Sequence, residues 1–184
     1  MQVQPIKTRI LRPPKDDLLS VIKESIHSIK ERSVLVVTSK VVSIWQGRVV
    51  KMSDVPNKDE LVIREAEKYL PRDATPGGFV MHTLKNNLLI PTAGIDESNA
   101  NGFYVLWPTE VAAVAKAIWE WIRKTYRVKN VGILVTDSHS IPLRRGVVGI
   151  SLAHFGFKPL KDYRNTKDLF GREFHFSQTN LADG

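Results

Sequence analysis

The chain has 184 residues, a formal net charge of +8 and no cysteine. The missing cysteines exclude disulfides, thiolate metal ligands and cysteine nucleophiles, a composition typical of a cytoplasmic protein. The length predicts one domain over residues 1–184 with a substantial core. No apolar run approaches the roughly 20 residues that cross a bilayer, so we expect no membrane partner. The charge favours polyanionic ligands such as nucleotides, but the scattered Lys and Arg residues give little support to nucleic acid.

Strands and helices alternate in the first half of the chain. Residues 2–12 alternate loosely between apolar and polar side chains, which predicts a strand that a Pro-Pro pair ends. A helix follows, capped by Asp16 or Asp17 and running to about Lys30. The β-branched run 34–37 is typical of a strand buried on both faces. Further along, we expect extended or hairpin structure over 41–52 and a helix over 58–69.

The second half continues in the same way. The longest amphipathic pattern predicts a helix over 111–126, and the apolar run 131–135 predicts a second strand buried on both faces. We also expect a hairpin of 79–83 with 88–91, a short strand over 104–107, a strand or packed helix over 147–157 and a last strand over 173–178. Together these elements predict a layered α/β or α+β fold, which we take as α/β with an α+β-like mixed sheet and packed helices.

One polar cluster follows directly on a predicted strand. The stretch 90–99 ends with Asp96, Glu97, Ser98 and Asn99, all with oxygen-bearing side chains. A strand followed by a turn presents such groups at the edge of a sheet, where they suit a hard cation such as Mg²⁺ shared with phosphates. The alternative is a polar turn in which these side chains bind their own backbone.

Two predicted buried strands end in similar residues, Thr38-Ser39-Lys40 and Thr136-Asp137-Ser138. Hydroxyls and charges at strand ends are where open α/β sheets bind phosphates. We therefore pair Asp137 with Asp96 as ligands of Mg²⁺ or Mn²⁺, although Asp137 alone fits a cap or turn equally well. The cations that would face the same phosphates are Lys40, Arg144 and Arg145, of which the arginine pair also fits a basic surface turn.

Other catalytic motifs are missing. The sequence contains neither Gly-x-Gly-x-x-Gly nor the P-loop pattern, and its five histidines lack the spacing of a zinc site. Asp137, Ser138 and His139 supply the residue types of a hydrolase triad, but neighbours in sequence rarely meet in triad geometry. Metal and phosphate chemistry is the better hypothesis.

Four ordered blocks carry a resemblance to a known family. They are 38–50 (Thr-Ser-Lys-Val-Val-Ser, then Gln-Gly-Arg-Val-Val), 93–99 (Ala-Gly-Ile-Asp-Glu-Ser-Asn), 135–146 (Val-Thr-Asp-Ser with Pro142, Arg144 and Gly146) and 161–173 (Lys-Asp-Tyr, then Lys-Asp-Leu-Phe-Gly-Arg-Glu). In this order and spacing they resemble the coenzyme F420-0:L-glutamate ligase (gamma-glutamyl ligase) family. The likeness runs from about Leu11 to the last residue.

The resemblance implies the fold of that ligase family and an amide ligase that uses GTP and Mg²⁺ or Mn²⁺. Such an enzyme joins L-glutamate, through its amine, to a carboxylate acceptor that is first activated as an acyl phosphate. The partners implied are a nucleotide, a small-molecule carboxylate acceptor, L-glutamate and a second copy of the chain in a homodimer.

The resemblance also assigns residues. The metal ligands implied are Asp96, Asp137 and Ser138. The catalytic set is Asp96, Asp137 and Arg144. The nucleotide contacts implied are Leu11, Arg12, Pro13, Pro14, Ser39, Lys40 and Asn99.

Two departures from the family pattern leave alternatives open. Ile44 stands where the family usually has a nucleotide-binding lysine, and the chain ends before the family's C-terminal extension. They motivate a second hypothesis, a relative that binds a nucleotide or phosphorylated metabolite without ligating it. A third hypothesis, a nucleic-acid-binding module, depends on the net charge alone.

Overall fold

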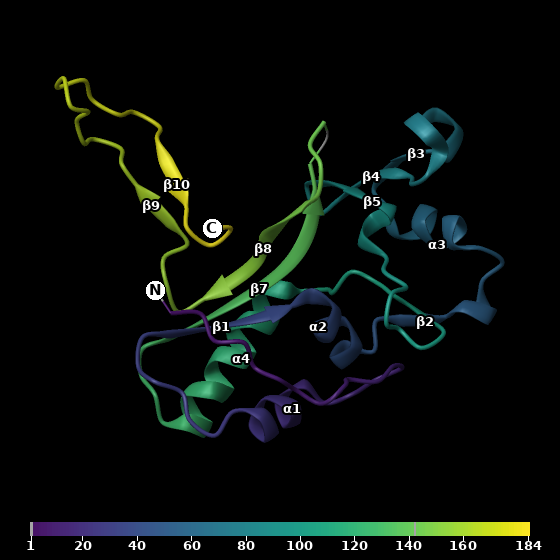
Figure 1. Cartoon of the computed structure of the whole chain (residues 1–184), viewed down its shortest axis with the longest axis horizontal. Helices are drawn as coiled ribbons and strands as arrows, with labels where there is room; N and C mark the ends of the chain where they lie inside the picture. The colour runs from purple at the N-terminus through teal and green to yellow at the C-terminus, as the bar shows by residue number, and fades with distance from the viewer. Residues whose placement is uncertain (1, 142) are drawn as a thin grey trace. The chain divides into compact units, whose positions relative to one another are not determined.

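The structure is a computed structural model that describes residues 2–141 and 143–184. Its contacts divide the chain into two compact units, and each unit is assembled from three stretches of sequence. Unit one comprises Met1–Ser28, Thr38–Glu110 and His139–Val148, and unit two comprises Ile29–Val37, Val111–Ser138 and Gly149–Gly184. Both units mix helices with sheets (Figure 1), which confirms the predicted α/β fold class. The prediction of one domain over 1–184 stays a prediction.

Unit one holds three short helices and two small antiparallel sheets, ordered β3-β4-β5 and β2-β6. The helices are α1 (Leu18–Ser25), α2 (Ser39–Gln46) and α3 (Lys58–Glu65). The strands are β2 (Val49–Lys51), β3 (Lys68–Leu70), β4 (His82–Lys85), β5 (Leu88–Pro91) and β6 (Phe103–Val105). Single 3-10 turns occur at η1 (Met52–Asp54), η2 (Arg72–Ala74), η3 (Pro76–Gly78) and η4 (Thr92–Gly94).

The predicted strand over 2–12 is wrong. This segment forms no strand or helix, and among its residues only Leu11 is buried. Apolar and polar side chains alternate in this segment, as they do in a strand. However, no described strand pairs with it, so it forms no part of a sheet. The helix after it begins as predicted, with Asp17 as N-cap accepting the backbone N–H of Leu19. It ends at Ser25 rather than Lys30, because the β-branched Ile26 already has extended backbone angles.

Helix α2 replaces the first part of the extended or hairpin structure predicted for 41–52, whereas β2 confirms extended structure over Val49–Lys51. Its β-branched residues favour a strand locally, but Val42, Ser43 and Ile44 are all buried on the face that this helix turns to the core. Packing of that face outweighs the propensity of single residues. Gly47, with φ of 72°, then ends the helix in the left-handed conformation that glycine adopts readily.

The predicted β4–β5 hairpin is confirmed, with a tight turn at Asn86 and Asn87. Both residues have positive φ, 50° and 61°, as a type I′ turn requires. The hairpin buries the side chains of Thr83 and Ile90, and a core cluster of the same unit includes Val62 and Met81. Helix α3 stops at Glu65, earlier than predicted, and the chain returns as β3 alongside β4.

Unit two is built on the sheet β1-β7-β8 and one long helix. Its elements are β1 (Ser33–Thr38), α4 (Val111–Tyr126), β7 (Val131–Ser140), β8 (Val147–Phe155), β9 (Leu160–Asp162) and β10 (Gln178–Asn180). Helix α4 has the predicted bounds, and residues 131–135 of β7 are all buried, as predicted. Strand β1 is a correction: Val34 and Val36 are exposed, so this strand is covered on one face and not on both.

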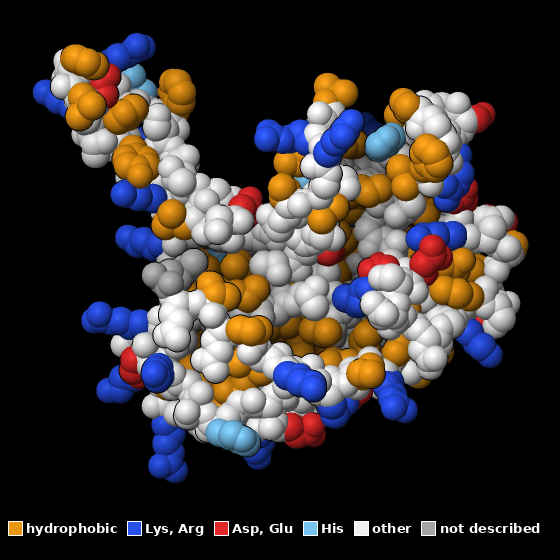
Figure 2. Space-filling model, viewed as in Figure 1, with side chains coloured by type: hydrophobic (Ala, Val, Ile, Leu, Met, Phe, Trp, Pro, Cys, Tyr) orange, Lys and Arg blue, Asp and Glu red, His pale blue; other side chains and the backbone are white. Residues whose placement is uncertain are grey.

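Trp119 joins α4 to the sheet of unit two. Its indole N–H donates to the Val131 carbonyl at 2.8 Å, and its ring centroid lies 4.8 Å from that of Phe155. Gly156, with φ of 85°, permits this approach, since a β-carbon there would overlap both the indole and the Val131 carbonyl. The last strand pair, β9 with β10, forms an extended arm that carries exposed apolar side chains (Figures 1 and 2). The homodimer stays a prediction.

In the described residues, no helix combines the length and the apolar character needed to cross a membrane.

A half-buried charge cluster links the elements of unit one. Glu65, at the end of α3, accepts hydrogen bonds from Lys85 and Arg48, each at 2.7 Å. Burial raises the pKa of Glu65, but the bonds and charges of Lys85 and Arg48 outweigh it, so the pKa lies below its ordinary value of 4.5. A carboxylate with a lowered pKa stabilises the folded state above that ordinary value and loses this effect as pH falls.

Glu65→Gln is therefore expected to lower the free energy of unfolding at pH 7 by about 1–3 kcal/mol, since it leaves Lys85 and Arg48 without their counter-charge. Denaturant titration at several pH values measures this loss, which should shrink as the pH falls below 4.5. Glu120→Gln, which removes an exposed pair with Lys116, is the control and should change stability by less than about 1 kcal/mol. A loss that does not depend on pH would contradict the ion-pair explanation.

Candidate functional site

The loop after β5 has a fixed and unusual backbone. Thr92, Ala93 and Gly94 all have positive φ, between 51° and 71°. The buried Thr83 hydroxyl holds this turn, because it donates to the Ile90 carbonyl at 2.6 Å and accepts the Ala93 N–H at 2.8 Å. A β-carbon on Gly94 would overlap the Trp107 ring. The turn thus needs glycine both for its backbone angles and for the space beside the indole.

Asp96 follows this turn and is anchored through its backbone. Its N–H donates to the Val105 carbonyl at 3.0 Å, and its carbonyl accepts the Val105 N–H at 2.8 Å. This single antiparallel bridge ties the loop to β6. The Asp96 carboxylate is therefore presented from a fixed point, as the sequence predicted for a group at a sheet edge.

The Asp96 carboxylate is paired with Lys40 at the start of α2. The Lys40 ammonium lies 2.5 Å from Asp96 Oδ2, 2.9 Å from the Ser98 carbonyl oxygen and 3.0 Å from Ser98 Oγ. Asp96 Oδ1 accepts the Ser98 N–H at 2.7 Å. Burial raises the pKa of Asp96, but the bonds from Lys40 and Ser98 outweigh it and leave the pKa below its ordinary value. The carboxylate is ionised at neutral pH.

Two of the predicted site segments thus meet within unit one. Ser39 and Lys40 come from the predicted strand end, which is the first turn of α2, and Asp96 and Asn99 come from the loop after β5. Ser39 is buried, whereas Asn99 is exposed with φ of 54°. The sequence pattern assigns Lys40 to phosphate and does not reveal its ion pair with Asp96. No local pattern signals a contact between residues this far apart.

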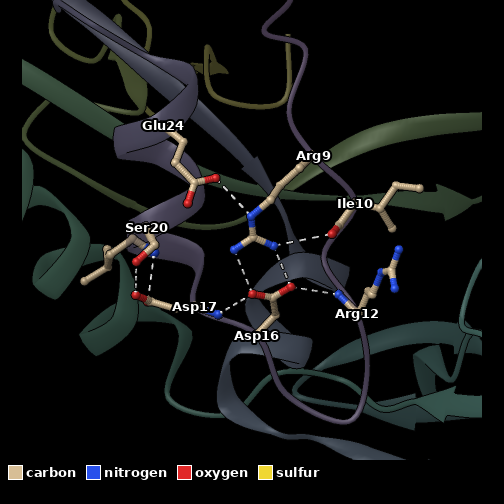
Figure 3. A network of polar contacts seen from close by, with 8 residues as sticks. Arg9, Ile10, Arg12, Asp16, Asp17, Ser20 and Glu24 are labelled. Atoms are coloured by element: carbon tan, nitrogen blue, oxygen red, sulfur yellow. Dashed lines mark hydrogen bonds and ion pairs between the residues drawn. The ribbon is translucent and has the colours of Figure 1, made fainter.

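The predicted nucleotide segment 11–14 also belongs to unit one. Leu11 is buried and Arg12 is exposed, and the peptide bond between Pro13 and Pro14 is cis. Asp16 accepts the backbone N–H of Arg12 at 3.0 Å (Figure 3). The segment is therefore held by a side chain rather than by a strand partner.

Asp137 and Ser138 lie in unit two, within β7. The strand continues to Ser140, so these residues do not follow the strand end, as predicted, but belong to the strand. Asp137 is partly buried, and its Oδ1 accepts the Ser138 N–H at 2.7 Å. Arg144 is exposed, and its backbone N–H donates to the Ile141 carbonyl. Asp96 and Asp137 belong to different units, and their pairing at one metal stays a prediction.

Ile44 is a core residue of unit one. It is buried in the core face of α2, with 3 % of its surface exposed. A lysine at this position of the same helix would bury its ammonium, so the structure explains why an apolar residue stands here. Among residues 2–141 and 143–184, no three His, Asp or Glu side chains group as a metal site.

Gly94→Ala is expected to lower the free energy of unfolding by about 2–4 kcal/mol, because the new methyl group meets the Trp107 ring and the backbone is left-handed. Gly102→Ala is the matched control. Gly102 has φ of 83° but nothing within 4 Å of the position that its new methyl group would take, so only the backbone cost of about 1–2 kcal/mol remains. Equal losses in the two variants, measured by denaturant titration, would show that Trp107 does not constrain the turn.

Comparison with known proteins places this chain in a family. The family model described as F420-0:Gamma-glutamyl ligase matches residues 5–184. The coenzyme F420:L-glutamate ligase of Archaeoglobus fulgidus is 30 % identical over the whole of this chain and 78 % of its own length. That of Methanopyrus kandleri is 28 % identical over the whole chain and 77 % of its length, and that of Methanosarcina mazei is 28 % identical over 91 % of the chain and 70 % of its length. Since the match spans nearly every residue, this chain belongs to the F420-0:gamma-glutamyl ligase family and has an α/β fold consistent with these ligases.

Proposed function

We propose that this chain is a metal- and GTP-dependent amide ligase that joins L-glutamate to a carboxylate acceptor. The relatives are named coenzyme F420:L-glutamate ligases, which supports coenzyme F420 or its precursor as the acceptor. The observation that carries the proposal is the cluster of oxygens around Lys40. Asp96 Oδ2, the Ser98 carbonyl and Ser98 Oγ all lie within 3.0 Å of one cationic group.

This oxygen cluster has the chemistry of a hard-cation site. Carboxylate, carbonyl and hydroxyl oxygens are the ligands that Mg²⁺ and Mn²⁺ prefer. The lowered pKa keeps Asp96 ionised, and its backbone bridge to Val105 fixes its position. In the proposal Asp96 holds the metal, with Asp137 and Ser138 as the further ligands. The metal would neutralise charge on the phosphates of the nucleotide.

Lys40 has a second role in this proposal. Its ammonium neutralises Asp96 in the structure, and it would turn to a phosphate oxygen once a divalent cation takes its place beside Asp96. Lysine suits such an exchange because its charge sits on a flexible four-carbon chain. Residues Leu11, Arg12, Pro13, Pro14, Ser39 and Asn99 would contact the rest of the nucleotide, and Arg144 would donate to the transferred phosphate.

The reaction then has two balanced steps. The acceptor carboxylate attacks the γ-phosphorus of GTP, the bond to the β-phosphate oxygen breaks, and GDP leaves with an acyl phosphate behind. The glutamate amine attacks the acyl carbon, inorganic phosphate leaves, and the amine gives up a proton as the amide forms. Cationic side chains that bind the phosphates favour the first step, because charge builds on the leaving oxygen.

A second function, nucleotide binding without ligation, is favoured by one observation. Ile44 stands where the family usually has a nucleotide-binding lysine, so this position supplies no cation to a phosphate. Calorimetry with GTP, ATP and Mg²⁺ combined with a phosphate-release assay separates the two functions. Phosphate release that requires both acceptor and amine supports the ligase, and nucleotide binding without such release supports the alternative.

Asp96→Asn and Asp137→Asn are each expected to abolish GTP turnover, a loss of at least about a hundredfold, because an amide holds a divalent cation far less well than a carboxylate. Glu97→Gln is the matched control, since Glu97 lies on the same turn but pairs with Lys58 at 3.6 Å. Circular dichroism checks that the fold is kept. Full turnover in either aspartate variant would refute its assignment as a metal ligand.

Lys40→Met is expected to act in opposite directions on two ligands. The affinity for Mg-GTP should fall about tenfold, because a charged phosphate contact is lost. Binding of Mn²⁺ alone should tighten, because no ammonium competes for Asp96. Mn²⁺ titration followed by electron paramagnetic resonance measures the second effect, with Lys58→Met as the control. An unchanged Mn²⁺ affinity would show that Lys40 and the metal do not share the Asp96 oxygens.

A further inference from the structure

We infer that Asp16, clamped by Arg9, is a positioning residue that holds the 11–14 segment ready for the nucleotide. Nothing in the sequence patterns or the family blocks links either residue to ligand binding. The inference depends on the proposed function in one respect, namely that the 11–14 segment contacts the nucleotide.

The Asp16 carboxylate collects four N–H donors (Figure 3). Its Oδ2 accepts the Arg12 backbone N–H at 3.0 Å and an Arg9 N–H at 2.7 Å. Its Oδ1 accepts the second Arg9 N–H at 2.9 Å and the Asp17 backbone N–H at 2.8 Å. One side chain thus fixes the backbone on both sides of the cis-proline turn. With 17 % of its side chain exposed, Asp16 is mostly shielded from water.

Arg9 binds a second carboxylate outside the clamp that it forms with Asp16. Its Nε donates to Glu24 on α1 at 3.0 Å, while its two terminal nitrogens hold Asp16. The planar guanidinium matches a carboxylate with two parallel bonds, which a lysine cannot reproduce. The hydrogen bonds from Arg9 lower the pKa of Asp16 far below its ordinary range, so the charge of this pair persists at any physiological pH.

The 11–14 segment depends on this clamp because it has little else to order it. Residues 2–12 form no strand, and Leu11 is the one buried side chain among them. Arg12 is exposed, and its guanidinium points away from the Asp16 carboxylate (Figure 3). Asp16 therefore binds the backbone of Arg12 and leaves its side chain available to a polyanionic ligand.

A segment that is already ordered loses less conformational entropy when it binds a ligand. Loss of the clamp should therefore weaken nucleotide binding without altering the reacting groups, which come from other residues. This separates a positioning role from a catalytic one, since KM for GTP changes while kcat does not.

Asp16→Asn, which keeps size and removes charge, is expected to raise the Kd and KM for Mg-GTP about tenfold and to change kcat by less than about twofold. Arg9→Lys, which keeps charge and removes the paired bonds, should act in the same direction. Calorimetry and steady-state kinetics on the full chain measure these constants. Amide hydrogen exchange without ligand should become faster across residues 9–17 and stay unchanged in β4 and β5.

Glu24→Gln is the matched control, because it removes the outer partner of Arg9 and no contact to the 11–14 segment. Its Kd for Mg-GTP should equal that of the wild type. Suppose that the wild type binds Mg-GTP and that both Asp16→Asn and Arg9→Lys bind it equally tightly. The positioning role is then wrong and the proposed function stands. A wild-type chain that binds no Mg-GTP would overturn the proposed function and this inference together. A kcat that falls by the same factor as KM rises would also overturn the positioning role.

Discussion

The contact between the Lys40 ammonium and the Asp96–Ser98 turn is the interaction on which the candidate site depends. It connects the first turn of α2 to the loop after β5 and gathers three oxygens around one positive charge. The pair is only partly shielded from water, so it adds little to the stability of the fold. Its main effect is to fix the position of an ionised carboxylate. That placement requires the rest of unit one, since Thr83 and the bridge to Val105 set where Asp96 stands.

How far the sequence predicts this fold differs from element to element for physical reasons. The helix over 111–126 and the buried run 131–135 carry strong patterns over many residues, and the structure has both. Helix α2 was missed because its Val-rich sequence favours a strand, and the core contacts of Val42 and Ile44 decide otherwise. The coil over 2–12 is not predicted by the sequence. Alternation of apolar and polar side chains shows that a segment can form a strand, but a strand forms only where another strand pairs with it.

The sequence likewise predicts some features of the candidate site and not others. Asp96 and Lys40 could each be selected from local pattern, as oxygen and cation donors next to predicted strands, and the structure brings them together. Their ion pair could not be predicted from local patterns, since the two residues are 56 positions apart in the sequence (96 − 40). The sequence pattern identifies Asp16 only as one of two candidate helix caps. In the structure Asp17 is the helix cap, whereas Asp16 binds the Arg9 side chain and the Arg12 backbone. This difference depends on the direction of the two side chains, because the residue type is the same.

The two supports of the site in unit one are built differently, and this has a consequence for how the site can change. Asp96 is held by paired backbone hydrogen bonds to Val105, which involve no side chain. The 11–14 segment is held by one carboxylate and its arginine, so a single substitution can release it. If the 11–14 segment contacts the nucleotide as proposed, changes in nucleotide affinity are therefore expected to arise more easily in the N-terminal coil than in the Asp96 loop.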